Sequence, residues 1–158
     1  MSDATTTHRG IVIAGFGSPH GDDQAGWRVI EMLQKRTALP ARVVAIQEAT
    51  RLLEELDGCR KLVTIDACRS GGRVGTLTRL EWPDPRIEGH HSHSSHGMGL
   101  CGALRLAERL GRLPQEVQVF GIEIAEWEPG HEVTFEVLEA VKELDAVISA
   151  ELCEAVHA

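Results

Sequence analysis

The segment Ile11–Gly26, IVIAGFGSPHGDDQAG, joins a continuous apolar run to a glycine-rich turn and two adjacent aspartates. The run Gly10–Phe16 is rich in β-branched residues and ends at a glycine, which predicts a buried strand. We expect a helix from about Gln24 to Arg36, with Asp22 or Asp23 as its N-cap. Only one aspartate can be the N-cap, so its neighbour is available to bind a metal or to carry a proton.

The rest of the chain alternates between strand and helix patterns. A helix starting at Ser94 or Ser95 is expected to end near Leu110, before Gly111 and Pro114. The other expected elements are strands at Arg42–Gln47, Lys61–Asp66, Gly75–Glu81 and Val117–Ile122, helices at Arg51–Leu56 and Val133–Leu152, and a loop at Trp82–Ser95. This alternation predicts an α/β fold with a mostly parallel sheet covered by helices on both faces.

The composition is that of a globular protein, with 42% hydrophobic and 25% charged residues in 158. We expect one domain over 1–158, with a loose tail at 1–9. The net charge of −8 argues against a nucleic acid or an anionic membrane as partner, because both bind basic surfaces. The four cysteines form no CxxC pair, and no signal peptide or membrane span is visible, so we expect a cytoplasmic protein.

Polar residues gather at one predicted edge of the sheet. The first strand leads into the aspartate pair, and the strand KLVTID ends at Asp66. His96 stands at the expected start of a helix, on the same edge, where ligands bind in parallel α/β sheets. A carboxylate at a buried strand end must be paired, protonated or metal-bound. Two carboxylates and one imidazole suit a divalent ion such as nickel or zinc.

Other classes of site do not fit the sequence. The spacing of Gly15, Gly17 and Gly21 is not that of a dinucleotide fingerprint, and no Gly-Lys-Ser/Thr of a P-loop follows. HExxH and GxSxG motifs are also absent, which excludes a zincin and a serine hydrolase of the elbow type. A histidine tract precedes His96, and it is either a loose surface metal site or a solvated loop; its members are His90, His91 and His93.

Four motifs in order resemble those of the hydrogenase maturation endopeptidases, which process the carboxyl terminus of the large subunit of nickel-iron hydrogenases. They are IVIAGFGSPHGDDQAG, LVTIDACRSGGRVGTLTRL, SSHGMGLCGALRLAERLGRLP and VQVFGIEI, followed by the terminal helix. The resemblance implies a three-layer α/β/α sandwich around a five-stranded, mostly parallel sheet with one antiparallel edge strand. It also implies that Asp23, three residues before Gly26, acts with Asp66 and His96 as a catalytic, metal-binding trio; Asp22 and His93 are secondary candidates.

The function implied by this resemblance is removal of a C-terminal extension from a large-subunit precursor after nickel insertion. The nickel is then supplied by the precursor, no organic cofactor is needed, and we expect a cytoplasmic monomer. Three alternatives stay open. They are a nickel-dependent maturation chaperone that does not cleave, a hydrolase of another substrate on the same scaffold, and a surface nickel store built on the histidine tract.

Overall fold

The computed structural model describes residues 10–89, 98–125 and 128–157. Its strands are β1 (Ile11–Phe16), β2 (Arg42–Ile46), β3 (Lys61–Cys68), β4 (Leu77–Glu81) and β5 (Glu116–Glu123). They form one sheet in the order β2–β1–β3–β5–β4. All neighbours pair in parallel except β4, which lies antiparallel to β5 at the edge. The predicted five-stranded, mostly parallel sheet with one reversed edge strand is therefore confirmed.

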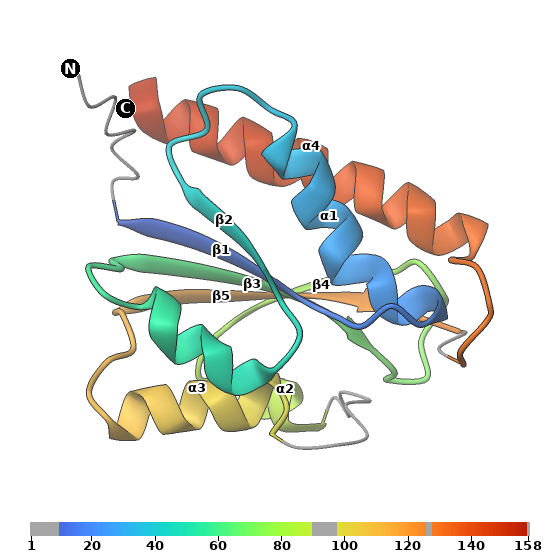
Figure 1. Cartoon of the computed structure of the whole chain (residues 1–158), viewed down its shortest axis with the longest axis horizontal. Coiled ribbons are helices and arrows are strands. Elements are labelled where there is room, and N and C mark those ends of the chain that lie inside the picture. The colour runs from blue at the N-terminus through green and yellow to red at the C-terminus, as the bar shows by residue number, and fades with distance from the viewer. Residues whose placement is uncertain (1–9, 90–97, 126–127, 158) are drawn as a thin grey trace.

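Helices cover both faces of the sheet, as the alternation of elements predicts (Figure 1). They are the 3-10 turns η1 (Gly21–Gln24) and η2 (Ala49–Glu55) and the α-helices α1 (Ala25–Gln34), α2 (Pro85–Gly89), α3 (Leu100–Arg109) and α4 (Phe135–His157). One hydrophobic core lies between the sheet and α1 with α4, and a second lies between the sheet and η2, α2 and α3. The apolar residues expected along the terminal helix, from Val137 to Leu152, are all part of the first core.

Two glycines of the opening segment allow α1 to lie directly against β1. A Cβ atom on Gly15 would stand 2.5 Å from the carbonyl oxygen of Gly26 and would also strike Ile30. A Cβ atom on Gly26 would collide with the carbonyl oxygen of Phe16. Because the two backbones meet without side chains between them, η1 is held against the carboxyl end of β1, where both aspartates of the segment lie.

The expectation that Asp22 or Asp23 caps the first helix is wrong. The N-cap positions of η1 and α1 are His20 and Gln24, and neither side chain makes a capping hydrogen bond. A 3-10 turn runs straight into α1, so both aspartates lie inside the turn rather than before it. Neither aspartate therefore occupies the N-cap position of η1 or of α1.

The region between β4 and α3 also differs from expectation. A short helix, α2, occupies part of the stretch expected to be a loop: the Asp84 side chain accepts a hydrogen bond from the backbone N–H of Arg86 at 2.9 Å, and Pro85 begins the helix. This is the usual start of a helix, a capping side chain followed by proline. The next helix, α3, begins at Leu100 after Gly99. Ser94 and Ser95, the expected cap, lie outside the described residues.

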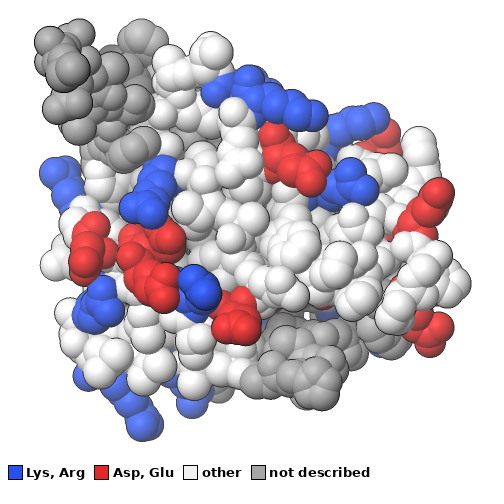
Figure 2. Space-filling view, in the orientation of Figure 1, with Lys and Arg blue, Asp and Glu red and all other residues white. Residues whose placement is uncertain are grey.

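Acidic and basic side chains are interspersed over the face that Figure 2 shows. Some ion pairs of the molecule join distant segments, such as Arg36 with the buried Asp145 and Arg42 with Glu55. In the described part of the chain, none of the helices combines the length and the apolar character that crossing a membrane requires.

Candidate active site

The carboxyl ends of β1, β3 and β5 lie side by side, at the right of the sheet in Figure 1. The turn η1 packs against β3 at this edge, which brings Asp23 near Asp66. Both side chains are half-buried. The two aspartates predicted to meet at the carboxyl edge thus come together there from separate segments of the chain.

The protonation of Asp66 reflects this neighbourhood. Burial, together with a smaller contribution from the negative charge of Asp23, raises the pKa of Asp66 from 3.8 to about 8, although a hydrogen bond from the backbone of Ala67 opposes the change. Two carboxyl groups that interact in this way resist carrying two negative charges at once. A proton or a divalent cation held between them would relieve the repulsion, so the oxygen donors present fit a metal ion.

Asp22 has a different environment, although it adjoins Asp23 in the chain. Its side chain is fully buried and accepts hydrogen bonds from the backbone N–H of Ala125 at 3.0 Å and of Thr134 at 2.7 Å, and from the Thr134 hydroxyl. These bonds tie η1 to the two ends of the connection between β5 and α4. Asp22 therefore stabilises the position of η1, the turn that carries Asp23.

A second buried carboxylate, Glu123 at the end of β5, organises the loop that follows β3. Its oxygens accept hydrogen bonds from the backbone N–H groups of Ser70, Gly71 and Gly72 at 2.9–3.1 Å, and from the Ser70 hydroxyl at 2.9 Å. The thiol of Cys68 donates a further hydrogen bond to it at 3.4 Å. One carboxylate thus holds the whole 70–72 turn beside the carboxyl end of β3.

The hydrogen bonds around Glu123 also influence the charge states of Glu123 and Cys68. Burial favours the neutral form of Glu123, but the donors on Ser70, Cys68 and Gly71 outweigh it and lower its pKa below the usual 4.5. Burial raises the pKa of the Cys68 thiol to about 12, with further contributions from its hydrogen bond to Glu123 and from the charges of Glu123 and Asp66. Cys68 is therefore a neutral hydrogen-bond donor and not a thiolate nucleophile.

The histidines predicted to complete the site cannot be placed. His96, with His90, His91 and His93, lies in the segment 90–97, outside the described residues. Over 10–89, 98–125 and 128–157, no three His, Cys, Asp or Glu side chains are grouped so that they could hold a metal ion. The structure brings the carboxyl groups of Asp23 and Asp66 together. The complete metal-binding trio of Asp23, Asp66 and His96 stays a prediction.

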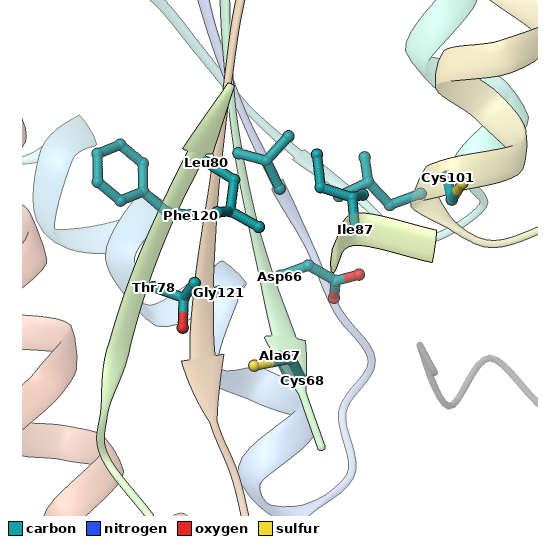
Figure 3. Close-up of a pocket in the computed structure, with 11 residues that line it drawn as sticks. Asp66, Ala67, Cys68, Thr78, Leu80, Ile87, Cys101, Phe120 and Gly121 are labelled. Atoms are coloured by element: carbon teal, nitrogen blue, oxygen red, sulfur yellow. The ribbon is translucent and has the colours of Figure 1, made fainter. Parts of the chain in front are cut away.

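A cavity opens beside Asp66, between the sheet and the helices α2 and α3 (Figure 3). Its empty space is about 430 Å³, part of which is open to solvent. Asp66 and Cys68 of β3 lie at one side of it, with Ile87 of α2 and Cys101 of α3 across from the sheet. The cavity therefore reaches from the interior to the carboxyl group of the candidate site.

Glu123 was not among the residues predicted to matter. The signal was present in the sequence, because VQVFGIE is an apolar strand that ends in a carboxylate, as KLVTID ends at Asp66. The same reasoning, that a buried carboxylate must have partners, applies to both strand ends. Only the tertiary structure shows that Glu123 finds its partners in the 70–72 turn.

Comparison with known proteins gives the family. Residues 27–151 match the sequence profile of the hydrogenase maturation proteases (HycI), and the chain belongs to this family. Asp66 and His96 fall within the matched residues, whereas Asp23 precedes them. The hydrogenase expression/formation protein HoxM of Cupriavidus necator is 30% identical over 123 residues, or 75% of this chain and 61% of that protein. HupM of Azotobacter chroococcum is also 30% identical, with 59% of its length covered, so the chain spans about three fifths of these relatives.

Solved structures agree with the fold. The hydrogenase maturating endopeptidase HybD from E. coli superimposes with a TM-score of 0.76 at 24% identity, covering 92% of this chain and 93% of that one. The [NiFe] hydrogenase maturation protease HybD from Thermococcus kodakarensis gives a TM-score of 0.72 at 22% identity, covering 90% and 98%. At these identities the likeness establishes the shared α/β architecture.

Proposed function

We propose that the protein is an endopeptidase that removes a C-terminal extension from the large-subunit precursor of a nickel-iron hydrogenase once nickel is in place. Membership of the hydrogenase maturation protease family supports the class of reaction. The observation that carries the site assignment is the approach of Asp23 to Asp66 at the carboxyl edge of the sheet. We expect the protein to act as a monomer in the cytoplasm.

In this proposal the nickel belongs to the substrate. Asp23, Asp66 and His96 bind the ion that the precursor already holds, and this contact both reports that nickel has been inserted and positions the scissile peptide. The mutual repulsion of the two carboxyl groups supports their role, because a cation removes it when the precursor docks. Carboxylate oxygens and an imidazole nitrogen are suitable donors for nickel, and they leave coordination positions for the ligands of the precursor.

Hydrolysis then requires a water molecule to attack the carbonyl carbon of the scissile peptide. The C–N bond breaks, and the proton lost by the water ends on the amine of the released extension. A carboxylate that accepts this proton as a general base contributes roughly 10²- to 10⁴-fold in rate. Asp66, whose pKa of about 8 lies near physiological pH, is the described group best suited to take and return a proton.

The test is to mix the protein with nickel-loaded precursor and to measure the mass of the large subunit. We expect the mass to fall by that of the C-terminal extension, and the nickel-free precursor to remain intact. A stable complex without a change of mass would indicate a chaperone that does not cleave. Cleavage of both forms at the same rate would refute nickel recognition.

Two variants separate recognition from chemistry. Asp23→Asn and Asp66→Asn keep the size of the side chain but remove the charge and the ability to accept a proton. If the trio binds nickel, both variants lose affinity for the loaded precursor in an equilibrium binding assay. Normal binding without cleavage would instead assign the two aspartates to the chemical step.

A further inference from the structure

The cavity beside Asp66 has a defined floor and wall. The floor consists of residues from β3, β4 and β5 that face α3, among them Thr78, Leu80 and Val119. At Gly121 the floor lacks a side chain, and a Cβ atom there would stand 3.1 Å from the Cys68 sulfur. The missing side chain therefore deepens the cavity at the position that pairs with Asp66 on the neighbouring strand.

The lining is mainly aliphatic. Leu80, Ile87, Leu100 and Val119 are each less than 8% exposed and enclose its inner part, while Cys101 of α3 is half-buried at its border. Phe120 contributes backbone only, because its ring points away from the cavity in Figure 3 and packs in the core on the other face of the sheet. Such a lining accepts an uncharged aliphatic group and disfavours a charged one.

The position of the cavity suggests what enters it. In an extended chain, successive Cα atoms are about 3.8 Å apart, so a residue next to a peptide bond held at Asp66 lies within one residue length of the opening. Asp66 is one of the residues that line the cavity, so its carboxyl group and the cavity adjoin each other. A side chain of the substrate can therefore enter the cavity while the neighbouring peptide group stays at the aspartates.

We propose that this cavity is the subsite that receives an aliphatic side chain, such as that of valine, leucine or methionine, from a residue flanking the scissile bond. The inference rests on the proposed endopeptidase function and adds to it a preference of the enzyme among substrates. Differences of one or a few methylene groups in an apolar pocket change kcat/KM by roughly 10- to 200-fold. The subsite thus predicts a size-dependent selection on one side of the cleavage position.

The experiment uses nickel-loaded precursor with Gly, Ala, Val or Leu placed immediately before the scissile bond, and a second series with the same residues immediately after it. For the wild-type protein we expect kcat/KM to rise roughly 10- to 100-fold from Gly to Leu in one of the two series. Cys101→Phe places a ring at the cavity, so it should reduce cleavage of the Leu substrate and spare the Gly substrate. Cys101→Ala enlarges the cavity and should shift the preference towards the larger residues.

Cys153→Phe is the matched control, because Cys153 is exposed on α4, on the opposite side of the sheet. This variant should keep the wild-type preference. Equal kcat/KM values across both series for the wild type, or an equal loss on Gly and Leu substrates in Cys101→Phe with an unchanged preference in Cys101→Ala, would overturn the subsite. A wild-type protein that cleaves none of the precursors would refute the endopeptidase function itself, and the subsite with it.

Discussion

The burial of Asp66, together with the nearby charge of Asp23, has a consequence for stability that can be measured without any hydrogenase. The folded protein keeps the Asp66 proton up to about pH 8, whereas the unfolded chain releases it near 3.8. Between these values the folded state binds up to one more proton than the unfolded state. The stabilisation associated with this proton is therefore fully present below about pH 4 and is lost as the pH rises through about 8.

The magnitude follows from proton linkage. While the folded state binds one proton more than the unfolded state, the free energy of unfolding falls by about 1.4 kcal/mol for each unit by which the pH rises. Because Asp66 is only half-buried and solvent screens its charge, this slope is an upper limit. Asp66→Asn cannot titrate, and its stability relative to the wild type should rise by up to about 3 kcal/mol from pH 5 to pH 7 and become constant above about pH 8.

The assay is urea unfolding of the wild type and of Asp66→Asn at several pH values from about 5 to about 9. Asp23→Asn is the informative companion, because it removes the charge that adds to the shift of Asp66. In that variant the pH-dependent loss of stability should occur at lower pH than in the wild type. Parallel pH profiles for the wild type and Asp66→Asn would refute the raised pKa of Asp66, and a profile of Asp23→Asn identical to that of the wild type would refute the contribution of the Asp23 charge.

Two further predictions concern the cluster around Glu123. Glu123→Ala leaves the 70–72 turn without its hydrogen-bond acceptor and should lower the free energy of unfolding, measured in urea at pH 7, by about 2–4 kcal/mol, because hydrogen bonds to a charged group are stronger than neutral ones. The control Glu139→Ala, at an exposed position, should lower it by less than about 0.5 kcal/mol. Equal losses in the two variants would contradict this role of Glu123. Since the pKa of Glu123 is lowered, its contribution is present above about pH 4.5 and disappears as the pH falls through the folded-state value. Alkylation with iodoacetamide at about pH 8 should label the exposed Cys153 rapidly and leave Cys68 unmodified in the folded protein, because burial and nearby carboxylates keep that thiol neutral; mass spectrometry of the labelled peptides measures this, and rapid labelling of Cys68 would be the contrary result.

Local sequence patterns determined most of the fold. Apolar runs ended by glycine or aspartate predicted β1 and β3, because such a run is typical of a strand buried on both faces. Apolar residues spaced by three and four predicted α4, because this period marks the buried face of a helix. Both kinds of pattern depend on neighbours close in the chain. The same logic placed Asp66 at the carboxyl edge of the sheet. The short helix α2 was missed because its apolar content, essentially Ile87, is too small to produce a period, although Asp84 and Pro85 mark its start.

What the tertiary structure alone decided is the environment of each carboxylate. Asp22 and Asp23 are neighbours with the same side chain, and in the sequence only the resemblance to the maturation endopeptidases, through the spacing to Gly26, favours Asp23 over Asp22. One is fully buried among donors from Ala125 and Thr134, more than a hundred residues away in the chain, and the other lies beside Asp66. Glu123 likewise finds its donors some fifty residues away. A carboxyl group takes its charge and function from whichever segments fold around it, and those segments are distant in sequence.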